Sequence, residues 1–497
     1  MKLARYAFAL IALLLAAVGF ASGQTIASTK ILNNGPDGQK LVFAVLGDGY
    51  AASDQAKYVD DVNVLVINGV FNHDFYKDNL KAFNVYRIDV ASKDSGVSKP
   101  NATKDTAFKT IYSGDWSRCW IEESNSTSGL LNAALSIIPK YDFVLLIENE
   151  SGFGGCRRGN RLYVTNGVDW DVVAHEYGHG IGGLFDEYSH ASKPFYNGIE
   201  FGPVVNSRNC STILNPQTVV WSSAISNPGL IIPLPTVFNG NSMDPNQTVG
   251  MFEGCGTYQR GIYRPVNDCR MKSNTPLFCP VCLAMMNRAV ARFFTTPVGL
   301  DFNLKWKTGD SAFDRMVFAN HVRTRTAEQN ALNQEIGSYL HVVMQVHKNG
   351  SPDIVNITQV EGPLPINGAV ASNSAMITNE SNQPATVEFL PDDPFKIRGF
   401  EDPKDRRGEF SAEVDSATIT VDLPRLEMAD AAAGKIRLEL SKVSGTADGT
   451  IPQTLTGAAL LQQLRTAGRL IRQATVSEGK LKNAARDMSK ARTIQER

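Results

Sequence analysis

The chain has 497 residues, of which 43% are hydrophobic and 20% are charged; this corresponds to about three domains of roughly 150 residues and is ample for a sizeable core. Because 49 basic residues balance 50 acidic ones, the composition disfavours nucleic-acid binders, which usually carry a strong basic excess. The ordinary content of 41 Gly and 23 Pro excludes collagen-like, coiled-coil and low-complexity chains.

The N-terminus has the features of an export signal. Two basic residues precede an apolar segment at residues 6–18, which is near the upper length limit of a signal peptide and short for a membrane span. The small residues Ala21 and Gly23 predict cleavage before Gln24, which makes residues 1–23 a signal peptide. An uncleaved anchor is the alternative. We expect a secreted or periplasmic protein without stable membrane insertion.

Strands and helices are predicted to alternate between residues 24 and 295. We expect strands at residues 40–46, 83–90, 141–147 and 161–165, and helices at 54–71, at 129–138 and from about 169 onward. This alternation favours an α/β domain with a central sheet flanked by helices. The strand at 161–164 would serve either as an edge strand that pairs with an extended substrate or as an ordinary interior strand.

The seven cysteines all lie between residues 119 and 282. In an oxidising compartment such a cluster favours disulfides, although spacing does not define their connectivity and the odd number leaves one cysteine over. The CPVC element at Cys279 and Cys282 fits a redox pair or half of a zinc site. The redox interpretation lacks a thioredoxin-like context, and a four-cysteine zinc site is disfavoured in an exported chain.

The pattern changes beyond residue 295. Strand-like segments at 340–346, 385–390 and 417–423 predict a β-sandwich-like accessory domain at residues 296–450. A helix is predicted from Leu455 onward, within a basic tail at 451–497. We interpret it as a solvated or frayed terminal helix, and docking to an acidic envelope surface is the alternative.

The chemically informative segment is residues 169–188, DWDVVAHEYGHGIGGLFDEY. His175 and His179 are four residues apart, so on a helix both imidazoles leave the same face and can bind one ion. The Glu176 carboxylate can then reach a metal-bound water. Two surface histidines on an ordinary helix are the alternative, but chance rarely produces H-E-x-x-H in a chain with seven histidines.

A catalytic zinc ion needs three protein ligands and an open position for water. Gly182 and Gly183 are expected to end the helix and let the chain reverse, which brings Asp186 and Glu187 toward the histidines. We predict Asp186 as the third ligand, with Glu187 or a residue outside this segment as alternatives. The acid that does not bind metal would support a ligand or cap a helix.

Three motifs in this half of the chain resemble the IgA-peptidase family of secreted zinc metalloendopeptidases. They are LGDGY at residues 46–50, HEYGHGIGGLFDEY at 175–188, and GMFEGCGTYQRGIYRPVNDCRMKSN followed by FCPVC within 250–282. The resemblance covers about residues 35–295 and leaves out the C-terminal part. The second motif is also similar to the metzincin pattern H-E-x-x-H-x-x-G-x-x-H/D, except that Phe185 occupies the third-ligand position and Asp186 follows one residue later.

The resemblance implies a metzincin-like catalytic domain at residues 24–295 with one catalytic Zn²⁺. Met271 would correspond to the methionine turn beneath the metal, although ordinary packing is the alternative. Tyr263 is the candidate that would help to hold the tetrahedral intermediate, with a packing role as the alternative. Asp48 is expected to be structural, either orienting the sheet edge or binding a Ca²⁺ ion.

We therefore expect an α/β, metzincin-like zinc-peptidase domain, followed by the β-sandwich-like accessory domain and the C-terminal helix. The expected function is a secreted zinc-dependent endopeptidase that acts on protein or peptide substrates, with Glu176 as general base. An exported zinc amidase that acts on cell-wall peptides would use the same ligands. A non-catalytic binding protein with a relic metal site is the remaining alternative.

Overall fold

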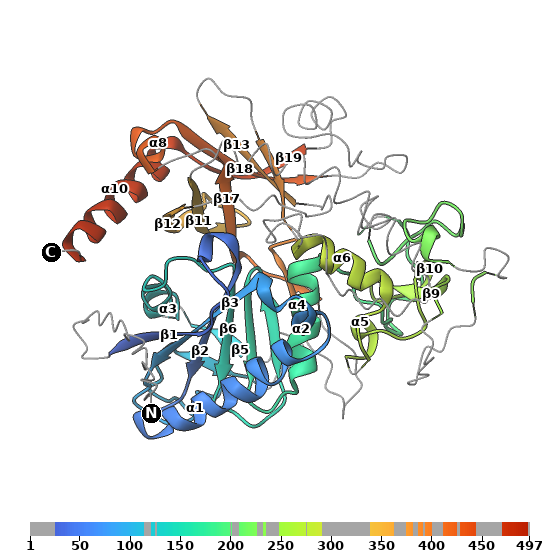
Figure 1. Ribbon diagram of the computed structural model, residues 1–497, viewed down its shortest axis with the longest axis horizontal. Coiled ribbons are helices and arrows are strands. Elements are labelled where there is room, and N and C mark those ends of the chain that lie inside the picture. Colours follow the sequence, from blue (N-terminus) through green and yellow to red (C-terminus); the bar gives the residue numbers. More distant parts are fainter. Residues whose placement is uncertain are drawn as a thin grey trace, which may run out of the picture.

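The computed structural model has a mixed α/β architecture with an eight-stranded sheet at its centre (Figure 1). The structure describes residues 25–113, 121–124, 127–198, 200, 208–225, 232–234, 248–274, 276–290, 338–361, 374–380, 386–390, 393–399, 411–424, 428–443 and 470–495. The predicted signal peptide lies outside these residues. No helix within the described ranges is both long enough and apolar enough to span a membrane.

The central sheet combines parallel and antiparallel pairing. The strands in spatial order are β1 (Ile26–Leu32), β3 (Phe83–Val90), β2 (Leu41–Asp48), β6 (Phe143–Glu148), β8 (Arg161–Thr165), β7 (Gly155–Arg158), β15 (Lys396–Gly399) and β16 (Ser411–Glu413). The four strands from β3 to β8 run parallel to their neighbours, and the outer pairs are antiparallel. The four strands predicted in this region are thereby confirmed, two of them with identical bounds.

Of the two interpretations of residues 161–164, the structure confirms the interior strand and excludes the edge strand. Strand β8 pairs with β6 on one side and with β7 on the other, so it is an interior strand. All five of its residues are buried, and a strand covered on both faces in this way normally has neighbours on both sides. The backbone of β8 is therefore not available for pairing with a substrate.

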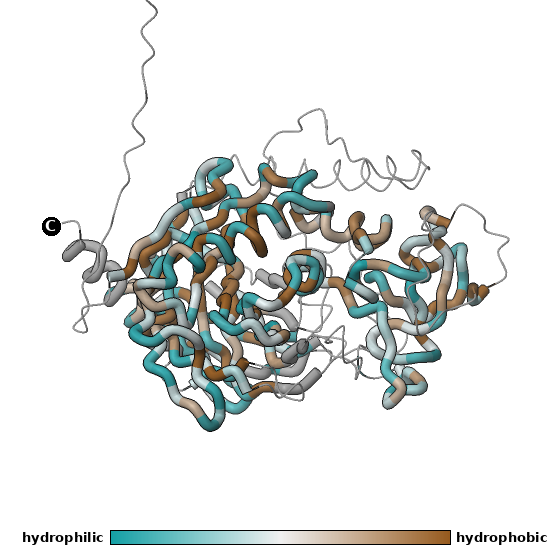
Figure 2. Tube along the Cα trace, turned by 90° about the horizontal axis from the view of Figure 1, so that it is seen from below, coloured by the Kyte–Doolittle hydropathy of each residue, from teal (hydrophilic) through white to brown (hydrophobic). Residues whose placement is uncertain are grey.

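Helices cover both faces of the sheet. On one face, side chains such as Phe43 and Val45 share a core with α1 (Gln55–Val62), α2 (Asp74–Asp78), α4 (Trp170–Gly182) and α6 (Pro280–Val290). On the other face, Ala44 and Leu46 pack with α3 (Thr127–Leu135). Neighbouring residues of a strand point to opposite faces, and Figure 2 accordingly shows hydrophobic stretches inside the main body with hydrophilic residues along its outer turns.

Helix α4 packs closely on strand β6 through Gly180. A Cβ atom added to Gly180 would lie 2.7 Å from a ring carbon of Phe143, and that ring is stacked on Phe43, with a centroid distance of 5.3 Å. We expect Gly180→Ala to lower the free energy of unfolding by about 1–3 kcal/mol because the ring has no room to move. Urea unfolding would measure this loss of stability.

The control is Gly129→Ala, on α3, where no atom lies within 4 Å of an added Cβ and up to about 1 kcal/mol of stabilisation is expected. Equal effects at both positions would contradict the packing argument.

Short elements complete the N-terminal part. They are the paired strands β4 (Thr110–Tyr112) and β5 (Ile121–Glu123), the paired strands β9 (Phe252–Cys255) and β10 (Tyr258–Arg264), and the short helix α5 (Arg270–Ser273). The β9–β10 pair lies to one side of the central sheet, beyond α5 and α6 (Figure 1). The segment that follows α4 is therefore next to a separate small sheet.

Two further sheets form the C-terminal part. One contains β12 (Asp353–Glu361), β11 (Ser338–His347) and β17 (Ser416–Pro424), and the other contains β14 (Thr386–Phe389), β13 (Ser374–Glu380), β18 (Ile436–Val443) and β19 (Leu470–Val476). Their buried side chains form one core with α8 (Met428–Ala433) and α10 (Glu478–Gln495). The predicted strands at 340–346, 385–390 and 417–423 correspond to β11, β14 and β17.

The C-terminal part also contributes directly to the central sheet. Strand β15 pairs with β7 and is followed in the sheet by β16. The His341 Nε2 atom lies 2.9 Å from the Tyr141 carbonyl oxygen, and the Asn160 N–H donates to the Thr418 carbonyl over 3.1 Å. The two parts thus share a sheet, and the predicted boundary at residue 295 lies outside the described residues.

The C-terminal tail differs in part from its prediction. Residues 470–476 form strand β19 instead of continuing a helix from Leu455, while α10 confirms a terminal helix. The helix is docked, because Leu481 and Ala485 are fully buried in the C-terminal core. The Lys480 Nζ atom also lies 2.9 Å from the Asp353 carboxylate. Residues 470–476 form a strand because β18 offers them a pairing edge, which local helical spacing does not reveal.

Candidate metal centre

The helix that carries the H-E-x-x-H motif starts shortly after β8 ends and runs through the interior. All residues of α4 from Val172 to Ile181 are buried. Gly183 ends the helix in a left-handed conformation with φ of +60°, and its N–H donates to the His179 carbonyl over 3.0 Å. This is a common way to end a helix, and it favours glycine because a side chain strains a positive φ. The predicted reversal at the glycine pair is therefore confirmed.

The reversal of the chain places the Asp186 carboxylate next to the two histidines. The Asp186 Oδ1 atom lies 3.2 Å from His175 Nε2 and 2.9 Å from His179 Nε2. The other ring nitrogens face backbone carbonyls: His175 Nδ1 lies 2.8 Å from the Arg270 oxygen, and His179 Nδ1 lies 2.6 Å from the Leu184 oxygen. A carbonyl only accepts hydrogen bonds, so a proton on each Nδ1 satisfies these contacts, and the Nε2 atom of each ring is the one that faces Asp186.

Three electron-pair donors therefore converge in a buried place. Each of the three side chains is at most 2% exposed, and His179 Nε2 has no hydrogen-bond partner despite its proximity to Asp186. Electron pairs that face one another at these distances need a proton or a metal cation between them. The separations are close to the edge of about 3.3 Å expected for a tetrahedron with 2.0–2.1 Å bonds to zinc. The donor set thus fits a divalent metal ion.

Glu176 lies beside this donor set. One of its carboxylate oxygens is within 4.8 Å of a ring nitrogen of each histidine. The side chain is fully buried, and neither oxygen has a hydrogen-bond partner. Burial raises the pKa of Glu176, while the two histidines and Arg157 on β7 attract its negative charge and partly oppose that rise. A buried carboxylate without partners is well placed to accept a proton.

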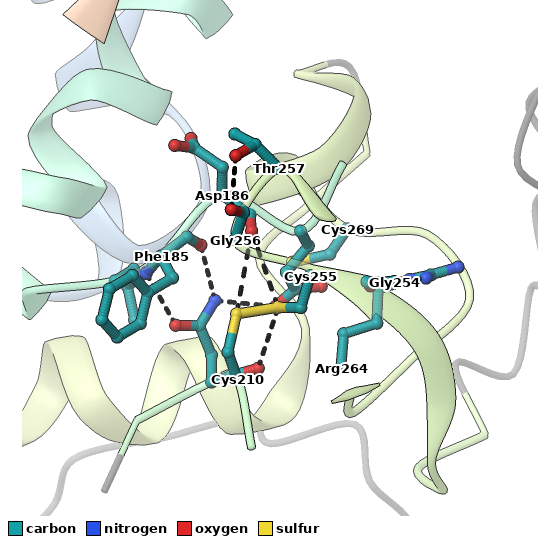
Figure 3. Close-up of a disulfide and its surroundings, with 12 residues drawn as sticks. Phe185, Asp186, Cys210, Gly254, Cys255, Gly256, Thr257, Arg264 and Cys269 are labelled. Carbon is teal, nitrogen blue, oxygen red and sulfur yellow. Dashed lines mark hydrogen bonds between the residues drawn. A yellow bond between two sulfur atoms is a disulfide. The ribbon is translucent and has the colours of Figure 1, made fainter. Parts of the chain in front are cut away.

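The Asp186 segment is held by Asn209 and lies beside the disulfide between Cys210 and Cys255 (Figure 3). The Asn209 side chain accepts a hydrogen bond from the Phe185 N–H and donates one to the Phe185 carbonyl, both over 2.8 Å. The next residue, Cys210, is bonded to Cys255, and the Asp186 carbonyl accepts the Gly256 N–H over 2.7 Å. These contacts fix the backbone on both sides of the Asp186 side chain.

The segment around Met271 packs against helix α4 and contacts the residues that follow it. Its neighbour Arg270 supplies the carbonyl that orients His175, and the Met271 carbonyl accepts the Glu187 N–H over 2.6 Å. The Met271 side chain is fully buried, and its sulfur would lie 2.9 Å from a Cβ added to Gly178. Met271 therefore packs against the helix that carries both histidines, as the methionine-turn hypothesis requires.

The two acids after the helix point to different places. Asp186 faces the histidines, whereas Glu187 accepts a hydrogen bond from Asn209 Nδ2 over 2.9 Å and lies 3.1 Å from Cys282 Sγ. The structure therefore brings Asp186 to the histidine pair and does not bring Glu187 there. This arrangement agrees with the order of preference predicted from the sequence.

Tyr263 and Asp48 occupy other positions. Within the described part of the chain, Tyr263 pairs its backbone with Ser211 and Glu253, and no contact joins its hydroxyl to the histidine pair. The Asp48 carboxylate accepts hydrogen bonds from the N–H groups of Phe108 and Thr110. These bonds support the structural interpretation of Asp48, which orders the loop that follows β3.

Sequence reasoning did not identify the groups that hold the candidate metal ligands in place. The Leu184 and Arg270 carbonyls are backbone atoms, which carry no residue signature. Asn209 lies 24 residues from Phe185, in a segment without a recognisable pattern. A general rule gives the only available signal, because histidines that bind metal usually donate their second ring N–H to a carbonyl or carboxylate.

The comparisons with known proteins agree with this geometry. A search of curated proteins found no match to the chain. The family model described as IgA Peptidase M64 matches residues 29–245, a segment that contains the H-E-x-x-H helix and Asp186. By this match residues 29–245 are similar to the IgA-peptidase family, which is a family of metallopeptidases.

Proposed function

We propose that the protein is a secreted zinc-dependent endopeptidase. The observation that carries this proposal is the buried convergence of two histidine Nε2 lone pairs and the Asp186 carboxylate, next to a carboxylate without hydrogen-bond partners. His175, His179 and Asp186 would hold the metal. Nitrogen and oxygen ligands in this number are typical of catalytic zinc in peptidases.

A zinc ion in this place would lower the pKa of a bound water to about 7 and polarise the substrate carbonyl. Glu176 accepts the proton of the attacking water and returns it to the leaving amine. Its burial suits both steps, because a raised pKa lets the carboxyl group carry the proton between them. Tyr263 remains our candidate for a donor to the oxyanion.

Two observations support export. The pattern at residues 1–23 is typical of a cleaved signal peptide, and the disulfide between Cys210 and Cys255 is consistent with an oxidising, extracellular or periplasmic compartment. We propose that residues 24–295 form a metzincin-like catalytic domain, that residues 296–450 form a β-rich accessory domain, and that residues 451–497 form the basic tail.

Substrate and metal dependence can be tested together. We expect the purified protein to cleave casein and to leave peptidoglycan fragments intact. Removal of zinc with a chelator should abolish cleavage, because the hydroxide and the polarised carbonyl both depend on the ion, and addition of zinc should restore it. Product release is measured by mass spectrometry. Cleavage of peptidoglycan alone would favour the cell-wall amidase, and zinc binding without hydrolysis of either substrate would favour a binding protein.

A further inference from the structure

Three cysteines and Glu187 form a second buried cluster behind the Asp186 segment. Cys269 precedes α5, and Cys279 and Cys282 lie at the start of α6. All four side chains are fully buried, and their ligand atoms lie within 4.8 Å of one another. The proposed hydrolysis uses none of these groups, so the cluster calls for its own explanation.

The sulfur positions fit a metal site better than a disulfide. Cys269 Sγ and Cys282 Sγ are 3.8 Å apart, whereas a disulfide needs about 2.0 Å. A tetrahedral zinc ion with Zn–S bonds of about 2.3 Å would separate two sulfur ligands by about 3.8 Å. The structure thus matches the edge of such a tetrahedron without any movement of the two sulfurs.

Backbone N–H groups point at two of the sulfurs. The Cys279 N–H donates to Cys269 Sγ over 3.1 Å, and the Cys282 N–H donates to Cys279 Sγ over 3.4 Å. Such hydrogen bonds stabilise the negative charge of a thiolate, which is the form that binds metal.

Glu187 provides an independent indication of a cation. Its side chain is fully buried, Oε1 accepts hydrogen bonds from Asn209 Nδ2 and from Cys282 Sγ, and Oε2 has no hydrogen-bond partner. Desolvation of a carboxylate is costly unless a positive charge compensates it. The nearby Arg264 guanidinium attracts the Glu187 carboxylate through space, but it donates hydrogen bonds to backbone carbonyls such as those of Glu253 and Gly254. A bound cation would satisfy the remaining oxygen.

We propose that Cys269, Cys279, Cys282 and Glu187 bind a second, structural zinc ion. Thiolate ligands select zinc over magnesium or calcium, and four protein ligands leave no open position for water, as in structural sites. The ion would join the residue after Asp186 to the residue before Arg270, whose carbonyl orients His175. The second site would thereby fix the positions of the Asp186 and Arg270 segments relative to each other.

The zinc content of the full-length chain tests this proposal. We expect two zinc ions per chain, and one in His179→Ala, whose histidine site is broken. X-ray absorption at the zinc edge of His179→Ala should show sulfur neighbours at about 2.3 Å. Cys282→Ser should instead lose the sulfur-bound ion. A spectrum of His179→Ala without sulfur neighbours, or iron in place of zinc, would overturn the assignment, whereas a single sulfur-bound zinc in the unmodified chain would instead contradict the histidine site.

The thiol content of the unmodified chain gives a second test that needs no variant to fold. After denaturation with a chelator and without reductant, alkylation should label Cys269, Cys279 and Cys282. Cys210 and Cys255 should stay unlabelled, because they form a disulfide. A disulfide between Cys279 and Cys282 would overturn the proposal. Neither test depends on peptidase activity, so failure of the proposed function and failure of the second site are distinguishable.

Discussion

Glu176→Gln should lower kcat for peptide cleavage by about 10²–10⁴-fold, the usual contribution of a general acid–base group, while the zinc content stays unchanged. Glutamine keeps the size of the side chain but cannot take up the proton of the attacking water. Glu176 is fully buried and its oxygens have no hydrogen-bond partners to lose, so the substitution should leave the surrounding structure intact. Kinetics with a fluorogenic peptide and metal analysis of the same sample would measure both effects.

The matched control is Glu478→Gln, at the exposed start of α10. It makes the same chemical change far from the histidines in sequence, and we expect unchanged activity. Full activity of Glu176→Gln would reject the general-base role. Loss of zinc from Glu176→Gln would instead indicate that Glu176 helps to hold the metal.

The predicted elements that agree with the structure are those with strong local signals. The continuous apolar run that forms β2 is typical of a strand buried on both faces, and the glycines after His179 end α4 as local backbone preferences require. Both signals act over a few residues. They fix the helix, the spacing of the two histidines and the point at which the chain reverses.

The features that sequence reasoning left open or missed depend on contacts between segments that pair in space. The interior position of β8 requires β7, the next strand back along the chain, to pair on its far side, and β19 is a strand because β18 lies beside it. Likewise, the cluster of Glu187 with Cys282 joins residues that are 95 positions apart. A single sequence lists such partners without indicating that they meet.

The choice between Asp186 and Glu187 shows this limit most clearly. Both are acids directly after the reversal, and their spacing from His175 differs by a single residue. What separates them is the environment on each side of the backbone. Asp186 faces two imidazoles, whereas Glu187 is held by Asn209 and faces sulfur atoms. Neither environment is encoded near the two acids in the chain.

Asp186→Ala and Glu187→Ala should therefore remove different metal ions. Asp186→Ala should weaken zinc binding at the histidines and abolish cleavage, because a direct ligand is lost. Loss of a group that only hydrogen-bonds to a ligand typically weakens metal binding by about 10–100-fold, and we expect a larger effect here. Glu187→Ala should leave the histidine-bound zinc in place and release the sulfur-bound ion. Zinc stoichiometry, the zinc-edge spectrum and kcat of each variant give the comparison. Loss of the histidine-bound ion from Glu187→Ala, with both ions retained in Asp186→Ala, would make Glu187 the third ligand and reverse the assignment.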